Sequence, residues 1–469
     1  MKSGPQTENM KMKIYYSLFL TLLFAQKVHG DCLYDKYLRH CSCSLLELNN
    51  IMSILPCAAA TSFEFNGGTF INTEDFSLID IKVVWEIAGV SLTKISFVNV
   101  VLSEDFLAAF ISVIFQVPVD LLLFENTTFV GQSVGFNLME SPPHILALQF
   151  INVSSNPLIQ RDTAFYRFGN WMSILKNLTV KESLLRGVPC DIALLFQSLS
   201  TLDLSDNLFS DHNVSSMFCN GAYPNLQTLK LRSSNFSNYE ILCQALSRYD
   251  QLRYLDLSLN DFSKMSNSLC EWQPSLSHLN LSNTGLEQES ISLPPNCEVL
   301  DLSYNRIEFL NISLPHLREL YLSFTRLSTL SSIGHMPLLN ILAVDGNPIK
   351  MLQVSQIQTF KNLRSFRGDN IPYTCSCSFI KEMKAISISN LTVQGWPDGY
   401  VCDSPETFNG KLINDVNHSM FDCHTQLLTG VICAVILILC VSVVICFVKI
   451  CRSNKTRSHC MDSGNSNSV

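Results

Sequence analysis

The sequence lacks an excess of positive charge. Its 32 lysine and arginine residues are outnumbered by 40 aspartate and glutamate residues, which gives a formal net charge of −8. A protein that binds nucleic acid needs a basic face to contact the phosphates, so this balance argues against a nucleic-acid partner. For the same reason, the charge of the whole molecule would not attract an anionic ligand.

The sequence also lacks catalytic motifs. It contains no G-x-S-x-G, no H-E-x-x-H and no phosphate-binding loop, and its ten histidines show no triad spacing. Two C-x-C pairs raise zinc as an alternative, but no histidine pair lies near them. We therefore expect a protein that is not an enzyme, with no cofactor and no metal site.

Two apolar runs stand near the ends of the chain. In residues 1–30, two lysines precede an apolar run too short to span a membrane, which predicts a signal peptide. Residues 427–448 carry no charge and predict a transmembrane helix, and the basic residues in 449–469 mark that short tail as cytoplasmic. These features predict a single-pass type I protein anchored in the cell membrane. A cleaved lipid-anchor signal is a weaker alternative, because the tail is polar and basic.

Leucine-rich segments recur over residues 63–370. The segment "LRYLDLSLNDF" at 252–262 fits the template L-x-x-L-x-L-x-x-N. Further copies begin at Leu92, Val119, Ile145, Leu175, Leu199, Leu226, Leu276, Cys297, Leu317, Leu339 and Leu363. We expect about 11–12 units, each a short parallel strand with its apolar positions inward and an Asn, Ser or Thr that bonds the backbone at the turn. The predicted fold class is an α/β leucine-rich-repeat solenoid (horseshoe) whose two ends need caps.

Two cysteine clusters predict these caps, at 31–62 and 371–426. The two cysteines of a C-x-C are too close to bond each other comfortably, so we predict crossed pairing, although each set of four allows three pairings. The predicted disulfides are Cys32–Cys43, Cys41–Cys57, Cys190–Cys219, Cys243–Cys270, Cys375–Cys402 and Cys377–Cys423. Cys297 stands at a leucine position and is expected to be a buried thiol. Cys446 and Cys451 are candidates for palmitoylation beside the membrane.

The caps and repeats together resemble the monocyte differentiation antigens, which are co-receptors for bacterial lipopolysaccharide. The resemblance covers about residues 32–350 and is carried by "CLYDKYLRHCSC" at 32–43, by "SFEFNGGTFINTEDF" at 62–76 and by the linking cysteines. That family usually ends in a lipid anchor. Here "CSCSFIKEMKAI" at 375–386, "WPDGYVCDSPE" at 396–406 and the membrane span resemble the C-terminal cap of a Toll-like receptor.

The N-terminal quarter is richer in aromatic and branched side chains than the repeats need. They either fill a wide first part of the solenoid or line a pocket. The co-receptor family binds acyl chains in an apolar pocket near its N-terminus, so the resemblance implies a lipid site here. The candidate ligand-binding residues are Phe63, Phe65, Phe76, Ile79, Ile81, Val83, Trp85, Ile87, Phe97, Val101, Phe106 and Phe110.

The sequons indicate which surfaces glycans would cover. They start at Asn126, Asn152, Asn177, Asn213, Asn235, Asn280, Asn311, Asn390 and Asn417. None precedes residue 126, which leaves the N-terminal quarter free of sugar. Asn280 lies within a strand motif, so a glycan there would stand on the strand face unless regular structure keeps that sequon unmodified.

These features and the resemblance predict a cell-surface pattern-recognition co-receptor. It would bind microbial lipid, either lipopolysaccharide or lipopeptide, and pass it to a Toll-like receptor complex. The alternative is a cell-adhesion or decoy receptor that binds a protein on its concave strand face, where Asp203, Asp256 and Tyr321 point outward. The sequence allows a homodimer.

Overall fold

The computed structural model describes residues 32–44, 56–70, 92–103, 106, 119–130, 145–155, 170–264, 270–287, 291–350, 352–387, 390–417 and 425–461. The chain divides into two compact units. The first comprises Met1–Leu327 with Ser332–Ala343, and the second comprises Ser328–Ser331 with Val344–Val469.

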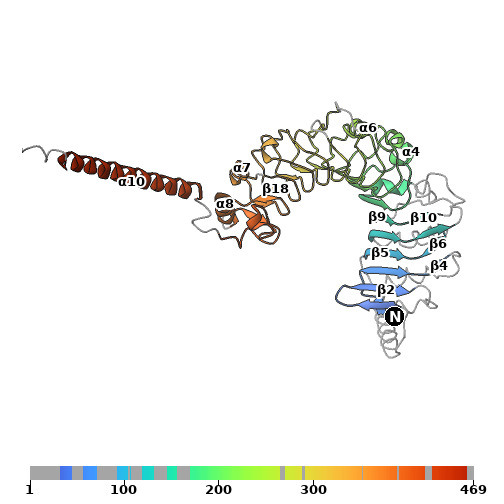
Figure 1. Ribbon diagram of the computed structural model, residues 1–469. Helices are drawn as coiled ribbons and strands as arrows, with labels where there is room; N and C mark the ends of the chain where they lie inside the picture. Colours follow the sequence, from blue (N-terminus) through green and yellow to red (C-terminus); the bar gives the residue numbers. More distant parts are fainter. Residues whose placement is uncertain are drawn as a thin grey trace, which may run out of the picture. The chain divides into compact units, whose positions relative to one another are not determined.

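The first unit is built on one long sheet whose strands follow one another in chain order, as Figure 1 shows for β2, β5 and β9. The strands are β1 (Cys32–Asp35), β2 (His40–Ser44), β3 (Ser62–Asn66), β5 (Leu92–Val98), β7 (Val119–Glu125), β9 (Ile145–Ile151), β11 (Asn177–Lys181), β12 (Thr201–Asp203), β13 (Thr228–Lys230), β14 (Tyr254–Asp256), β15 (His278–Asn280), β16 (Val299–Asp301), β17 (Glu319–Tyr321) and β18 (Ile341–Ala343). β1 and β2 are antiparallel, and the pairs that follow are parallel. The leucine-rich-repeat solenoid predicted from the template is confirmed.

One leucine from each of eight neighbouring strands joins a single buried column. Its members face one another in register across neighbouring strands: Leu178, Leu202, Leu229, Leu255, Leu279, Leu300, Leu320 and Leu342. All eight side chains are buried, while the residues on either side of each lie at the opposite face. A period of two along a strand has this consequence, since successive side chains point to opposite faces.

Buried polar side chains form hydrogen bonds with the backbone at the turns of the repeats. The Asn207 amide donates to the carbonyls of Val180 at 2.7 Å and Leu204 at 2.9 Å, and its oxygen accepts from the backbone N–H of Leu185 at 3.0 Å. Thr284 stands at the equivalent position, where its hydroxyl donates to the Leu281 carbonyl at 2.7 Å. The predicted backbone bonding at the turns is confirmed, and it explains why these buried polar groups are tolerated.

A second, smaller sheet accompanies the first repeats. Its strands are β4 (Thr69–Phe70), β6 (Val101–Ser103), β8 (Thr128–Val130) and β10 (Ser154–Ser155), in parallel order β10-β8-β6-β4. Each follows a long-sheet strand after a tight turn (Figure 1). Later repeats carry short helices instead: η6 (Asn170–Ile174), α4 (Cys190–Ala193), η7 (Asp211–Asn213), α5 (Val214–Met217), α6 (Tyr239–Leu246) and η8 (Leu330–Ser332).

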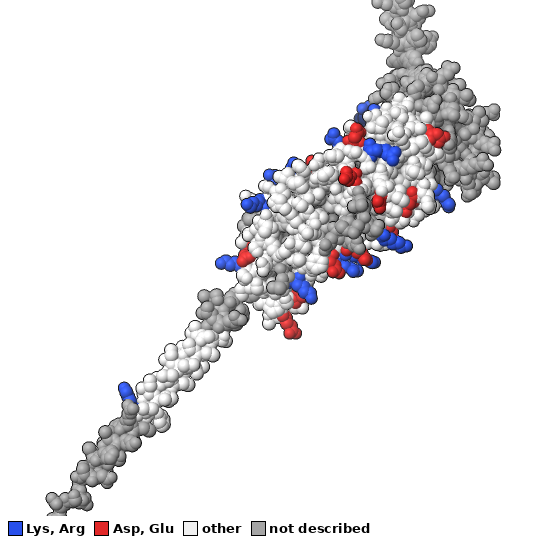
Figure 2. Space-filling model, turned by 90° about the horizontal axis from the view of Figure 1, so that it is seen from above, with Lys and Arg blue, Asp and Glu red and all other residues white. Residues whose placement is uncertain are grey.

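The second unit contains two small parallel strand pairs and a long helix. β19 (Ser365–Arg367) pairs with β21 (Thr392–Gln394), and β20 (Tyr373–Thr374) pairs with β22 (Cys402–Ser404). The helices are α7 (Val354–Gln358), α8 (Cys377–Ser387), η9 (Glu406–Phe408) and α10 (Thr425–Met461). Within α10, Thr429–Ile450 is long and apolar enough to cross a membrane, two residues later at each end than the predicted span. This part of α10 is almost free of charge in Figure 2.

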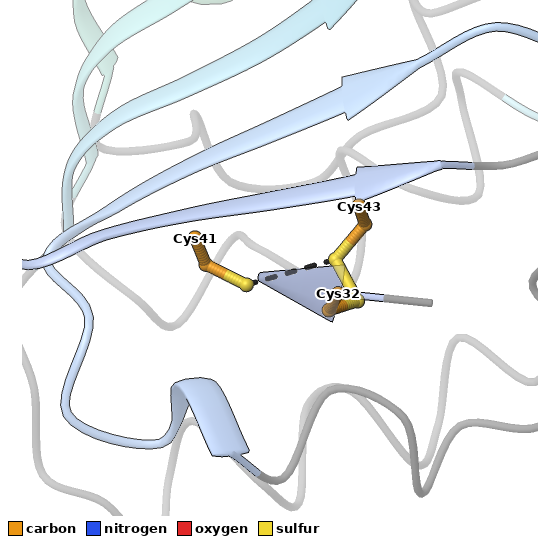
Figure 3. A group of neighbouring side chains, drawn as sticks. All are labelled: Cys32, Cys41 and Cys43. Atoms are coloured by element: carbon orange, nitrogen blue, oxygen red, sulfur yellow. Dashed lines mark hydrogen bonds between the residues drawn. A yellow bond between two sulfur atoms is a disulfide. The ribbon is translucent and has the colours of Figure 1, made fainter. Parts of the chain in front are cut away.

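The N-terminal cap is a knot of two disulfides. Cys32 pairs with Cys43 and Cys41 with Cys57, which is the crossed pattern predicted from the C-x-C spacing. Figure 3 shows how closely the sulfurs gather, with Cys41 Sγ 3.6 Å from Cys43 Sγ. Three cysteines this close could hold a metal ion as thiolates. Here each sulfur is already bonded to another sulfur, so the cluster serves as a covalent cap.

Further disulfides join neighbouring repeats and close the second unit. Cys190–Cys219, Cys243–Cys270 and Cys375–Cys402 are formed as predicted. Cys377 is also disulfide-bonded, and its predicted partner Cys423 lies outside the described residues. Cys297 is a free, buried thiol, as expected from its leucine position, and burial raises its pKa to about 12. Such a thiol is unreactive at neutral pH.

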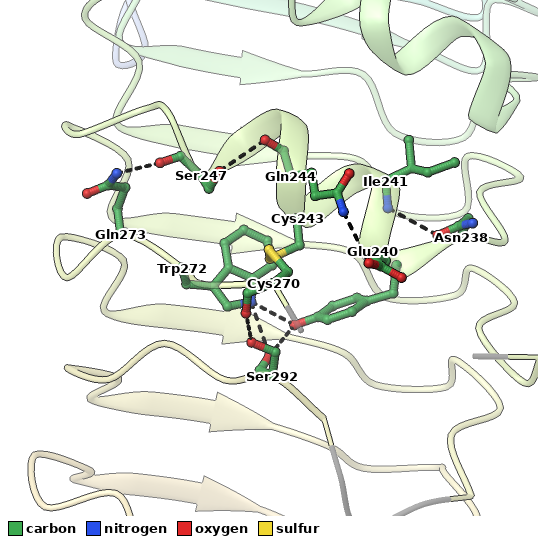
Figure 4. Close-up of a disulfide and its surroundings, with 11 residues drawn as sticks. Asn238, Glu240, Ile241, Cys243, Gln244, Ser247, Cys270, Trp272, Gln273 and Ser292 are labelled. Atoms are coloured by element: carbon green, nitrogen blue, oxygen red, sulfur yellow. Dashed lines mark hydrogen bonds between the residues drawn. A yellow bond between two sulfur atoms is a disulfide. The ribbon is translucent and has the colours of Figure 1, made fainter. Parts of the chain in front are cut away.

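The Cys243–Cys270 bridge lies beside an aromatic pair that ties three repeats together (Figure 4). The Trp272 indole N–H donates to the Tyr239 hydroxyl oxygen at 3.0 Å, and that hydroxyl donates to the Ser292 carbonyl at 2.8 Å. Because the indole N–H and the tyrosine hydroxyl both have hydrogen-bond partners, burying the two rings leaves neither polar group unsatisfied. Burial raises the pKa of the Tyr239 hydroxyl, which keeps it neutral and able to donate.

Candidate ligand-binding region in the N-terminal repeats

Four phenylalanines form a stacked column inside the first repeats. Phe65, Phe97, Phe124 and Phe150 come from β3, β5, β7 and β9 and face one another in register. Successive ring centroids are 5.3, 5.4 and 5.3 Å apart, with interplanar angles of 25°, 6° and 12°. Each ring occupies the third apolar position of its repeat, where most later repeats carry leucine. Offset stacking at this spacing is favourable, so the column stabilises these repeats while making their interior aromatic.

A second layer of rings covers this column. Phe129 on β8 meets Phe124 and Phe150 edge-on, with centroid distances of 5.4 and 6.3 Å. Phe70 on β4 lies 5.2 Å from Phe106, whose backbone N–H donates to the Ser103 hydroxyl at 3.0 Å. The interior of the first repeats is therefore filled by apolar side chains from both sheets. In later repeats the interior is filled by leucines and by side chains of the short helices.

The predicted pocket residues divide into three groups. Phe63, Phe65, Phe97 and Phe106 are fully buried, and Val101 is half-buried on β6. Phe76, Ile79, Ile81, Val83, Trp85, Ile87 and Phe110 lie outside the described residues. The first group therefore belongs to the packed aromatic interior of these repeats. The sequence reading missed Phe124, Phe129 and Phe150, although the repeat template aligns Phe124 and Phe150 with Phe97.

The opposite, solvent-facing side of the sheet carries a polar column. Asp203, Lys230, Asp256, Asn280, Asp301 and Tyr321 lie in register on six neighbouring strands. Asp203 and Lys230 lie 4.0 Å apart. Burial, with a contribution from the charge of Asp256, raises the pKa of Asp301. The centre of this strand face is thus acidic and would favour a cationic partner.

Two predicted glycosylation sites lie in a ladder of asparagine side chains. Each Nδ2 donates to the Oδ1 of the previous rung: Asn99 to Asn66 at 3.2 Å, Asn126 to Asn99 at 3.1 Å and Asn152 to Asn126 at 2.7 Å. Asn99, Asn126 and Asn152 have φ of 57°, 50° and 51°, a left-handed conformation that asparagine tolerates better than most residues. The ladder thus places each nitrogen that would carry a glycan against the previous rung.

We expect lower glycan occupancy at Asn126 and Asn152 than at Asn311 and Asn390. Neighbouring rungs sit one strand spacing apart, about 4.8 Å, which leaves little room for a sugar on Nδ2. All four asparagines are exposed, but Asn311 and Asn390 lie outside the ladder and serve as internal controls. Glycopeptide mass spectrometry of the full-length protein from mammalian cells measures all four sites. Equal, near-complete occupancy at the four would show that the ladder does not form before the glycans are added.

The fold defines a leucine-rich-repeat solenoid, and within the described residues one helical segment is able to span a membrane. By sequence the chain is similar to Toll-like receptor 2. It is 35% identical over 357 residues to the protein of Cricetulus griseus, covering 69% of this chain and 45% of that one. It is 32% identical over 292 residues to the protein of Homo sapiens, covering 61% and 37%. The matched region is thus less than half the length of these relatives.

The solved structure of the mouse RP105/MD-1 complex also matches. The TM-score is 0.50 with 16% sequence identity, over 76% of this chain and 67% of that one, which supports the fold alone. The chain matches no protein-family model. These relatives agree with a resemblance to Toll-like receptors in general, and the likeness to the monocyte differentiation antigens stays a prediction.

Proposed function

We propose that this protein is an innate-immune receptor of the cell surface that binds microbial lipid, either lipopolysaccharide or lipopeptide, in its N-terminal repeats. It would present that lipid to a Toll-like signalling receptor and catalyse no reaction itself. The observation that carries the proposal is the aromatic column of Phe65, Phe97, Phe124 and Phe150, which makes the interior of these repeats apolar and rich in rings. Similarity to Toll-like receptor 2 supports the receptor class.

The free energies available from each kind of contact favour recognition of the lipid through its acyl chains. Burying an acyl chain of about 12 carbons contributes up to about 10 kcal/mol, at about 0.8 kcal/mol per CH₂, before the costs of association. An exposed ion pair with a lipid phosphate contributes about 0–1 kcal/mol. A protein of net charge −8 can therefore bind an anionic lipid by its tails.

Competition between acylated and deacylated ligands tests the proposal. The full-length protein in nanodiscs should bind a fluorescent lipopeptide saturably, and the deacylated peptide should compete about 100-fold more weakly or not at all. D256N/D301N on the strand face is the matched control and should leave this binding unchanged. Absence of saturable binding, or equal competition by the deacylated peptide, would reject a lipid site.

The acidic strand face supports a second candidate function, the binding of a protein ligand there. In that case D256N/D301N would abolish capture of the ligand, since it removes the two carboxylates that flank Asn280. Asn280 itself carries a sequon, so a glycan at this position would obstruct the face. The lipid function therefore remains the first candidate.

A further inference from the structure

The N-terminal hairpin exposes large apolar side chains at its tip. It consists of β1, β2 and the turn between them, and residues 35–39 are all exposed. Tyr37 is 99% exposed, Leu38 is 73% exposed, and Leu33 on β1 is 76% exposed. Apolar residues exposed singly are common, but three within six positions of one hairpin form a cluster.

Bonds within the hairpin hold this tip in one conformation. The Cys32–Cys43 disulfide joins its two strands, and Cys41–Cys57 anchors it to the following segment. At the turn, one carboxylate oxygen of Asp35 accepts the backbone N–H groups of Tyr37 and Leu38 at 2.8 and 3.0 Å. The tip is therefore preorganised, so little conformational freedom is lost when it meets a partner.

The charge of the tip is opposite in sign to that of the whole protein. Lys36 and Arg39 flank the two apolar residues, and Asp35 is the acidic residue beside them. Two cations and one anion give +1 at the tip, in a protein of net charge −8. All three side chains are exposed, but one oxygen of the Asp35 carboxylate is bonded to the backbone of the turn. The Arg39 Nε–H donates to the Ala59 carbonyl at 3.3 Å. Apolar and basic side chains side by side are the combination that binds an anionic lipid surface.

We propose that the tip of this hairpin docks on the surface of an anionic lipid assembly. Tyr37 and Leu38 would enter the boundary between headgroups and acyl chains, where tyrosine is favoured because it has an apolar ring and a polar end. Lys36 and Arg39 would contact lipid phosphates. The inference deepens the proposed lipid function: it describes how the protein engages a lipid aggregate, whereas the stacked interior would hold an acyl chain.

Vesicle capture tests the proposal with the full-length protein held in nanodiscs of neutral phosphatidylcholine. The probes are phosphatidylcholine vesicles with or without phosphatidylglycerol, with soluble glycerol phosphate as a competitor. We expect capture of anionic vesicles, and no competition by glycerol phosphate. Y37S/L38S should weaken capture at least tenfold. Because each cation near an anionic surface contributes about fivefold in affinity, K36E should weaken capture more than fivefold on anionic vesicles alone.

The control is F309S, which removes an exposed ring, 46% accessible, elsewhere in the first unit. It should leave capture unchanged. Unchanged capture by Y37S/L38S, an equal loss in F309S or no capture by the wild type would each overturn the proposal. Full competition by glycerol phosphate would overturn it too, because it would show a simple anion site. Since Tyr37 and Leu38 are exposed, correct secretion of the variants is expected and confirms their folding.

Lipopeptide binding separates this inference from the proposed function. If Y37S/L38S loses vesicle capture but still binds monomeric lipopeptide, the docking role of the hairpin is supported independently of the interior site. If the wild type captures vesicles but binds no lipopeptide, the proposed function fails and the hairpin proposal stands.

Discussion

The variant F124A is expected to lose about 3–5 kcal/mol of the free energy of unfolding, the range seen when a buried ring is cut to alanine. Phe124 is completely buried, stacks between Phe97 and Phe150, and meets Phe129 edge-on. Its removal would interrupt the column in the middle and leave a cavity. Guanidinium unfolding of the full-length protein in detergent, with disulfides intact, measures the loss.

The matched control for this change is F124L. Later repeats carry leucine at the same template position, for example Leu204 and Leu257, so leucine keeps the pattern and fills much of the space. We expect a loss clearly smaller than that of F124A. A loss below about 1 kcal/mol for F124A would indicate that the ring borders open space rather than packed neighbours, because no new cavity would then form. The same experiment thus measures how tightly Phe124 is packed against its neighbours in the column.

The repeat template made most of the first unit predictable from the sequence. Its spacing places a strand wherever L-x-x-L-x-L occurs, and the buried leucine column follows from the period of two. For the N-terminal cap, the C-x-C excludes one of the three pairings, and the structure forms the predicted one of the two that remain. The apolar run at the C-terminal end is long enough to predict a membrane-spanning helix from its length alone. Its predicted and observed limits therefore differ by only two residues at each end.

Features that depend on neighbouring repeats were not predictable in the same way. The small sheet of β4, β6, β8 and β10 forms between segments that are each two or three residues long, which carry no periodic signal of their own. The stacking of Phe97 on Phe124 requires the register between two strands, and that register is set by pairing across the sheet. The ladder of Asn99, Asn126 and Asn152 combines this register with a left-handed backbone at each rung.

The variant N305A is expected to destabilise the first unit by at least about 3 kcal/mol. The buried Asn305 amide donates to the carbonyls of Leu281 and Leu302 at 2.8 and 2.9 Å, and its oxygen accepts from the backbone of Thr284 and Leu286, both at 3.0 Å. Alanine would leave these four backbone groups buried without the asparagine, and each such group costs about 1–3 kcal/mol. Denaturant unfolding of the full-length protein measures the change.

The sequence itself supplies the control for this experiment. Thr284 and Thr325 occupy the equivalent position in neighbouring repeats, where each hydroxyl donates to the carbonyl three residues earlier, at 2.7 and 3.1 Å. N305T should therefore keep the bond to Leu302, lose those to the preceding repeat and fall between the wild type and N305A. Equal losses for N305T and N305A would contradict this account, since they would mean that the bonds between repeats, and not the bond within the turn, carry all the stabilisation.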